Sequence, residues 1–218
     1  MSGHADYSKF INSIDKSIKI YNVPIIIANA ETLKGYGEIV YNFEKSKVIN
    51  VTWPKTHGRK LDENTGDQAL ETFGLFEFYY EKNYCCAKNN SVPNGDYITG
   101  VMVNDEKKSD KRIIYTYEAN YHPDGGQIVF PCKNNKGFVV LLSKADDNIT
   151  PGDFVSFYCD GSFGIQILPN IWHQPIYPIS EKAEYYNKQC SVHGCVTVNT
   201  LEEFNTILKL EIDLNLYK

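Results

Sequence analysis

Short apolar runs recur along the second half of the chain, and they constrain the fold more than any other feature of the sequence. They are separated by Pro, Gly and Asn residues and span 113–119, 128–132, 137–142, 154–159, 164–168 and 189–199. No helical pattern of ten residues stands between these runs. Short strands at this spacing favour an antiparallel sandwich or barrel over an α/β sheet. The sequence therefore predicts a mainly β fold with a few short helices.

The first half of the chain predicts further strands, at 23–27, 37–41, 73–80 and 97–103. Residues 8–20 have apolar side chains near helical spacing, which predicts an amphipathic helix or an ordered arm. Asn29 is expected to cap a helical turn that Gly35 ends, and Thr200 to cap a helix at 201–207. We expect one domain over 1–218, with an N-terminal arm at 1–22 and an inserted or divergent region at about 53–111.

Composition excludes several classes of protein. The chain has 218 residues, of which 42% are hydrophobic and 22% charged, so it has enough apolar surface to form a core. Its net charge of −5 provides no basic field for nucleic acid or for an anionic membrane. The longest apolar stretches, 23–28 and 138–142, are too short to span a bilayer. Without a signal pattern at the N-terminus, we expect a cytoplasmic protein whose six cysteines are free thiols.

Two histidines lie in segments where the backbone is held by turn residues. His122 occupies a Tyr-His-Pro-Asp-Gly-Gly-Gln turn between two expected strands, and Gln127 begins the second strand. His173 lies in a Trp-His pair bracketed by two prolines. If these side chains converge in the mouth of a barrel, the imidazoles can act as metal ligands or as acid and base near neutral pH. The alternative is that each histidine only satisfies turn carbonyls through its ring nitrogens.

The same segments resemble the ureidoglycolate lyase family. Residues 118–143 contain His-Pro-x-Gly-Gly-Gln, then Ile-Val-Phe-Pro and an apolar run, and are similar to the first half of that family's core. Residues 164–175, which end in Asn-Ile-Trp-His-Gln-Pro, resemble its second signature. Residues 149–153 and 32–40 match a turn and an N-terminal element of the family. The resemblance covers roughly a third to a half of the chain.

The resemblance implies a cupin-type double-stranded β-barrel, or jelly roll, that cleaves ureidoglycolate to glyoxylate and urea in allantoin and purine breakdown. In this reaction a base takes the hydroxyl proton and an acid protonates the departing nitrogen. His122 and His173 would be the catalytic pair, and with Gln127 they would be the ligands of a divalent metal ion if one is bound. Gln127, Lys133, Lys136 and Trp172 would contact the substrate. The resemblance implies no nucleotide cofactor.

Two other functions agree with the same residues. One is a cupin that binds a small molecule without catalysis. The other is a different metal-dependent cupin enzyme, in which His193 would join His122 and His173 around one ion. Barrels of this class often pair by strands across a twofold axis, so we expect a homodimer.

Overall fold

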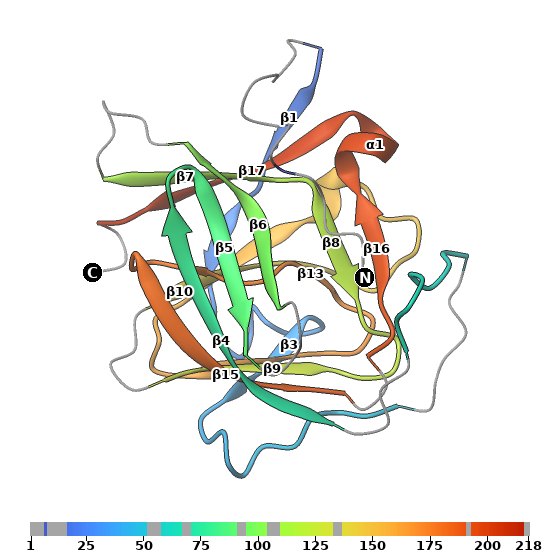
Figure 1. Cartoon of the computed structure of the whole chain (residues 1–218), viewed down its shortest axis with the longest axis vertical. Helices are drawn as coiled ribbons and strands as arrows, with labels where there is room; N and C mark the ends of the chain where they lie inside the picture. Colours follow the sequence, from blue (N-terminus) through green and yellow to red (C-terminus); the bar gives the residue numbers. More distant parts are fainter. Residues whose placement is uncertain are drawn as a thin grey trace.

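The strands form two facing sheets, as the sequence predicts (Figure 1). The computed structural model describes residues 7, 17–51, 58–66, 71–90, 95–103, 110–132, 137–190 and 193–215. In these residues most strand pairs are antiparallel. The all-β prediction is confirmed, and the arrangement is consistent with a jelly-roll sandwich.

The larger sheet contains ten strands among the described residues. In spatial order they are β1 (Lys19–Asn22), β17 (Thr206–Asp213), β7 (Lys111–Thr116), β6 (Asp96–Val103), β5 (Tyr84–Asn89), β4 (Thr72–Glu81), β15 (Lys182–Gln189), β9 (Gln127–Pro131), β12 (Gly164–Ile167) and β3 (Gly37–Val40).

The smaller sheet runs, within the same described ranges, through β16 (Val196–Asn199), β8 (Glu118–Tyr121), β13 (Trp172–His173), β10 (Phe138–Ser143), β11 (Val155–Cys159) and β2 (Ile25–Ile27). The short strand β14 (Tyr177–Pro178) pairs with β10. A 3-10 turn, η2 (Pro151–Asp153), precedes β11, and helix α1 (Thr200–Phe204) joins β16 to β17.

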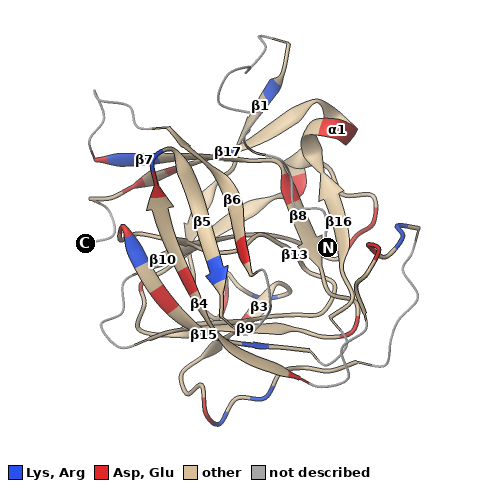
Figure 2. Cartoon of the chain, viewed as in Figure 1, with Lys and Arg blue, Asp and Glu red and all other residues tan. Residues whose placement is uncertain are grey.

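The hydrophobic pattern explains which strands lie inside. All six residues of β10 are buried, in agreement with its unbroken apolar run. In the outer part of the larger sheet, exposed and less exposed residues alternate along the strand instead. In β15, every second residue of the first half is exposed. Charged residues are therefore absent from β9, β12 and β13, and concentrate on strands such as β15 and β4 (Figure 2).

The apolar run at 189–199 was expected to be one strand, and this is wrong. β15 ends at Gln189 in the larger sheet, while β16 starts at Val196 in the smaller sheet. His193 between them has a left-handed backbone, with φ of 58°, which no strand accommodates. The alternation of apolar residues on both sides of this loop conceals the break. The strand β5 and most of β15 were not predicted.

Two expectations about helices also need correction. Thr200 is the first residue of α1, and the cap is Asn199, whose side chain accepts hydrogen bonds from the backbone N–H groups of Leu201 and Glu202. The helix ends at Phe204, because the chain turns at Asn205 into β17. At the N-terminus, 8–20 was expected to be an amphipathic helix or an ordered arm; residues 19–22 form a strand parallel to β17, so the end of this segment is not helical. Residues 8–16 of that expected helix lie outside the described residues.

Other local expectations are confirmed. The Asn29 side chain accepts from the N–H groups of Glu31 and Thr32, and Gly35 ends the turn with φ of 85°. All six cysteines are free thiols. Among the described residues, no helix is long and apolar enough to cross a membrane. The region at about 53–111 supplies β4, β5 and β6, which pair with one another in the larger sheet.

Candidate functional site

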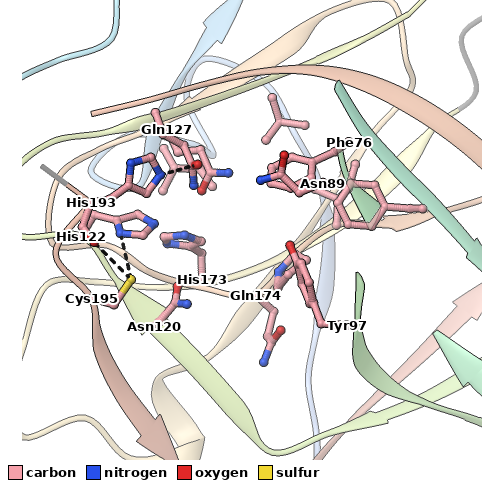
Figure 3. Close-up of a pocket in the computed structure, with 16 residues that line it drawn as sticks. Phe76, Asn89, Tyr97, Asn120, His122, Gln127, His173, Gln174, His193 and Cys195 are labelled. Atoms are coloured by element: carbon pink, nitrogen blue, oxygen red, sulfur yellow. Dashed lines mark hydrogen bonds between the residues drawn. The ribbon is translucent and has the colours of Figure 1, made fainter. Parts of the chain in front are cut away.

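A cavity of about 220 Å³ lies between the two sheets, where β8, β9 and β13 approach β4 and β15. Its walls differ in chemistry (Figure 3). One wall carries three histidines and several carboxamides, and the opposite wall carries aromatic side chains of β4 and β6. Both motif histidines line it, so the structure brings together the pair that the sequence singled out.

His122 and His173 are held in the same way. The Nδ1 atom of His122 lies 2.9 Å from the carbonyl oxygen of Gly194, and Nδ1 of His173 lies 2.9 Å from that of Ile171. A carbonyl can only accept a hydrogen bond, so each Nδ1 carries the hydrogen when the ring is neutral. Each Nε2 then has a free lone pair, and no described residue hydrogen-bonds to either of these Nε2 atoms.

The imidazoles form a cluster of three. The ring centroids of His122 and His173 are 5.1 Å apart, and those of His122 and His193 are 5.7 Å apart. His193 reaches the cavity from the loop between β15 and β16, and its Nε2 is hydrogen-bonded to Oε1 of Gln189. The sequence analysis named His193 only as an alternative metal ligand. Its position depends on the loop between β15 and β16, which the apolar pattern of 189–199 did not predict.

Burial keeps these imidazoles neutral at physiological pH. Desolvation and, to a smaller extent, the neighbouring His122 together lower the pKa of His173 to about 3. The pKa of His193 falls to about 4 for the same two reasons. Burial also lowers the pKa of His122, but the Gly194 carbonyl and the carboxylates of Asp124 and Asp62 oppose that change. Within the described part of the chain, only His122 and His193 of the three have a carboxylate near enough to stabilise the protonated ring.

Gln127 also lines the cavity, as expected, at the start of β9. Its side-chain Nε2 donates a hydrogen bond of 2.8 Å to Oδ1 of Asn187 on β15. This contact fixes which way the amide faces and directs its carbonyl oxygen away from Asn187. Gln127 is therefore oriented to accept a hydrogen bond.

The other residues expected to contact a substrate are placed differently. Trp172 is fully buried and is not part of the cavity lining. Lys133 and Lys136 lie outside the described residues. Their described neighbours Cys132 and Gly137 adjoin the ends of β9 and β10 that are opposite Gln127 and His173. Contacts of these three residues with a substrate stay a prediction.

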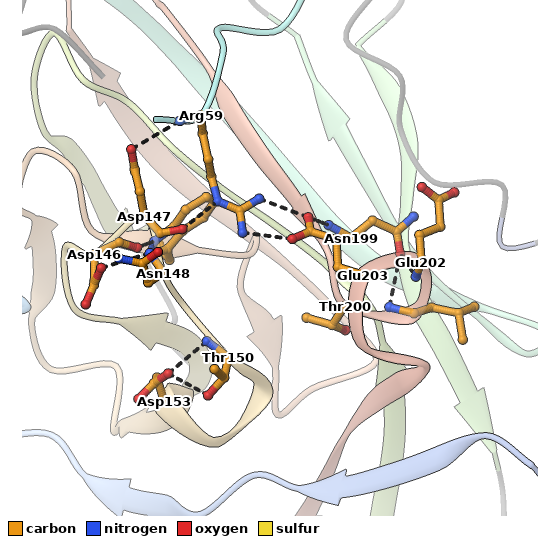
Figure 4. A network of polar contacts seen from close by, with 12 residues as sticks. Arg59, Asp146, Asp147, Asn148, Thr150, Asp153, Asn199, Thr200, Glu202 and Glu203 are labelled. Carbon is orange, nitrogen blue, oxygen red and sulfur yellow. Dashed lines mark hydrogen bonds and ion pairs between the residues drawn. The ribbon is translucent and has the colours of Figure 1, made fainter. Parts of the chain in front are cut away.

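Trp172 instead contacts Asp146 and Arg59, which belong to the polar network drawn in Figure 4. Its indole nitrogen donates to the carbonyl of Asp146 at 2.8 Å, and the Arg59 guanidinium lies 5.3 Å from the ring centre. Arg59 also makes two hydrogen bonds, of 2.9 and 2.8 Å, to the carboxylate of Glu203. The two residues of the Trp-His motif therefore have different positions: Trp172 packs in the core, and His173 lines the cavity.

Replacement of Glu203 by Gln should have a small effect, because the Arg59–Glu203 pair is partly exposed. We expect a loss of about 0.5–1 kcal/mol in the free energy of unfolding, which shrinks in high salt. Urea denaturation in low and high salt measures it. A loss that does not change with salt would contradict the electrostatic origin.

The described residues do not provide a metal site of the usual kind. No group of three His, Cys, Asp or Glu side chains among them is arranged to hold an ion. No carboxylate among the described residues lines the cavity, and the two imidazoles and the Gln127 amide supply three neutral ligands. The divalent metal therefore stays a prediction, and we derive no chemical step through it.

Several lining residues were missed because the region at about 53–111 showed no recognisable motif. Phe76 and Phe78 of β4, Asn89 of β5 and Tyr97 of β6 all line the cavity. The only signal for the two phenylalanines was their i, i+2 spacing, which places them on one face of a strand. Nothing in the sequence indicated that this face would lie opposite His122.

Asp124 holds the loop that carries His193. Its carboxylate accepts from the backbone N–H groups of His193, at 3.1 Å, and of Gly194, at 3.0 Å. The carbonyl of Gly194 in turn accepts from His122. The acidic side chain that follows the His-Pro pair therefore positions His122 through the backbone of a distant loop.

Replacement of Asp124 by Asn should lower the pKa of His122 further, because it removes the first of the two carboxylates that favour the protonated ring. An NMR titration of the imidazole C–H signals measures this pKa. Asp62→Asn is the matched control: Asp62 acts on His122 in the same direction but more weakly, so its shift should be smaller. An unchanged or raised pKa in Asp124→Asn would refute the assignment.

The comparisons with known proteins agree with the two motifs. The model of the family described as ureidoglycolate lyase matches residues 91–207, which is more than half of the chain. A curated ureidoglycolate lyase of Brucella anthropi is 31% identical over 64 residues. This stretch covers 29% of the present chain and 37% of that relative, so well under two thirds of the relative's length is matched. The matched family region contains both histidine motifs, and the chain belongs to the ureidoglycolate lyase family.

Proposed function

We propose that this protein is a carbon–nitrogen lyase that cleaves a ureidoglycolate-type substrate, in which one carbon carries both a hydroxyl and a ureido nitrogen, and releases urea. The observation that supports it best is the pair of buried neutral imidazoles whose Nε2 atoms are unpaired at the cavity. This arrangement suits proton transfer to and from a small bound molecule.

The chemistry requires one proton to move across the substrate. A base removes the hydroxyl proton, the oxygen's electron pair forms the carbonyl, and the carbon–nitrogen bond breaks toward the ureido nitrogen. That nitrogen takes a proton and leaves as urea. Because neither imidazole is charged at neutral pH, one ring has to accept the hydroxyl proton and then deliver it to the nitrogen.

We assign this role to His122. The imidazolium that forms during transfer would be stabilised by the Gly194 carbonyl, Asp124 and Asp62, whereas His173 has no carboxylate partner of this kind. A ring with a lowered pKa also gives up its proton readily. His173 would then accept a hydrogen bond from the substrate through Nε2 and orient it.

Asn120 supports the placement of the ureido group. Its Oδ1 is buried and has no hydrogen-bond partner among the described residues, although the side chain lines the cavity. An unpaired buried acceptor costs about 1–3 kcal/mol. A ureido N–H would satisfy it, and Asn120 pairs directly with His173 across β8 and β13.

The test is glyoxylate release from racemic ureidoglycolate by the purified full chain, after subtraction of the spontaneous rate, with and without a chelator. Release that survives the chelator supports the direct histidine mechanism. Release that the chelator abolishes and a divalent metal restores would replace it with a metal-assisted one. If neither ureidoglycolate nor an uncharged hydroxyalkyl urea is cleaved above background by the folded protein, the lyase proposal is wrong.

A further inference from the structure

We propose that the thiol of Cys195 forms a reversible covalent adduct, a hemithioacetal, with a small aldehyde bound in the cavity. This inference rests on the proposed function for the source of the aldehyde, because cleavage of ureidoglycolate releases glyoxylate beside the thiol. It adds a covalent modification site at which the product would be retained. Three observations carry it: the position of the sulfur, the contacts that hold its backbone, and the polar groups that face the same space.

Cys195 lies at the cavity beside the histidine that we assign as the base (Figure 3). Its Sγ atom is 3.5 Å from Nδ1 of His122. Among the described residues that line the cavity, Cys195 is the only cysteine, since the other five lie elsewhere in the fold. A small electrophile that enters the cavity therefore meets this thiol, next to the groups proposed to carry out the reaction.

Hydrogen bonds hold the backbone of this thiol on both sides. The carbonyl oxygen of Cys195 accepts a hydrogen bond of 2.8 Å from the backbone N–H of Asp62. Its own N–H donates to Oγ1 of Thr65 at 3.1 Å. The preceding residue, Gly194, donates its backbone N–H to the Asp124 carboxylate at 3.0 Å. These three contacts restrain the loop, so the sulfur stays at the cavity.

The polar groups that face the same cavity are largely hydrogen-bond acceptors. His122 and His173 are only 5% and 6% exposed, and each presents an Nε2 lone pair that no described residue uses. Oδ1 of Asn120 is a further buried acceptor without a partner in the described part of the chain. A free aldehyde can only accept hydrogen bonds, whereas the hydroxyl of a hemithioacetal can donate one. The cavity therefore favours the adduct over the free aldehyde.

The adduct forms without any further reactant. The sulfur attacks the aldehyde carbon, a carbon–sulfur bond forms, and the π electrons of the carbonyl move to its oxygen, which takes the proton that the thiol gives up. Nothing is oxidised or reduced, and the reverse step returns the thiol and the aldehyde. Burial raises the pKa of the Cys195 thiol to about 12, so the more nucleophilic thiolate is scarce at neutral pH. We therefore expect the adduct to form slowly.

Carbon-13 NMR of the full chain with glyoxylate labelled at its aldehyde carbon detects the adduct directly. At a glyoxylate concentration too low to modify free cysteine, we expect a new signal from a carbon bonded to sulfur and oxygen, which disappears on dialysis. Cys195→Ala and Cys195→Ser should lose this signal. Cys86→Ala and Cys132→Ala are the controls and should keep it, because these partly exposed thiols do not line the cavity. No new signal in the original protein, or a signal that persists in both folded Cys195 variants, would overturn the proposal.

Isothermal titration calorimetry measures what the covalent bond adds to binding. Glycolate carries the same carboxylate as glyoxylate but has no aldehyde, so it cannot form the adduct. We expect Cys195→Ala to weaken glyoxylate binding at least tenfold and to leave glycolate binding unchanged. Equal weakening of both ligands would mean that the substitution only disturbs the cavity, and unchanged glyoxylate binding would mean that the thiol takes no part. Either result would refute the proposal.

The cleavage assay separates this inference from the proposed function, because glyoxylate is added directly and no turnover is needed to form the adduct. An adduct at Cys195 in a protein that does not cleave ureidoglycolate would retain the thiol site and reject the lyase. Cleavage of ureidoglycolate by a protein that forms no adduct would retain the lyase and reject the thiol site.

Discussion

Replacement of His122 by Asn should lower kcat for urea release about 10²–10⁴-fold, which is the usual contribution of general acid–base catalysis. The Asn side-chain amide can still donate to the Gly194 carbonyl, as the imidazole Nδ1 does, but it has no basic nitrogen in the place of Nε2. The loop contact is therefore kept while the proton acceptor is lost. Steady-state kinetics and the melting temperature, measured together, test the prediction.

His173→Asn is the matched control for this experiment, because its amide can likewise keep the contact with the Ile171 carbonyl. We expect a smaller loss of kcat and a larger rise in KM, since His173 is assigned to orienting the substrate. The assignment of the base would be reversed if His173→Asn lost much more kcat than His122→Asn. It would fail altogether if both variants kept most of the activity at an unchanged melting temperature.

Acid should destabilise the protein strongly, and His173 should account for a large part of the loss. The pKa of its imidazole is 6.5 when unperturbed and about 3 in the folded protein. Between these values the unfolded chain binds the proton more tightly, so stability is complete above about pH 6.5 and falls as the pH decreases toward 3. Each unit of pKa difference corresponds to about 1.4 kcal/mol, which makes the full contribution on the order of 5 kcal/mol.

The variant His173→Asn isolates this contribution because it has no ionisable group at that position. Between about pH 7.5 and 4.5, it should lose about 2–3 kcal/mol less free energy of unfolding than the original protein. Urea denaturation at the two pH values measures both losses. The variant should still show some acid sensitivity, because the pKa values of His122 and His193 are also lowered. Equal acid sensitivity of the two proteins would contradict the burial of a neutral His173.

The β architecture and the histidine pair could be predicted from the sequence because both depend on local patterns. Apolar runs such as the one that forms β10 predict buried strands wherever they occur. The turn that carries His122 and the proline-bracketed segment that carries His173 restrict the backbone within a few residues. For such segments, local chemistry and tertiary structure agree.

The remaining parts of the site depend on contacts between distant segments. His193 reaches the cavity only because the chain leaves the larger sheet at Gln189 and enters the smaller one at Val196. Phe76 and Phe78 line the same cavity as the histidines because β4 pairs with β15, about a hundred residues later in the sequence. Pairings of this kind depend on the whole sheet, and no window of sequence contains them.

The sequence alone could not decide whether His122 or His173 is the proposed base, because both histidines lie at strand ends. The tertiary structure distinguishes them by the charges that face each ring: Asp124 and Asp62 lie near His122, whereas the charge-related influence on His173 comes from His122 itself. Local sequence therefore determined which side chains are the candidates for the proposed chemistry. Only the packing of the two sheets decided their electrostatic surroundings, because burial and charge proximity are properties of the assembled fold.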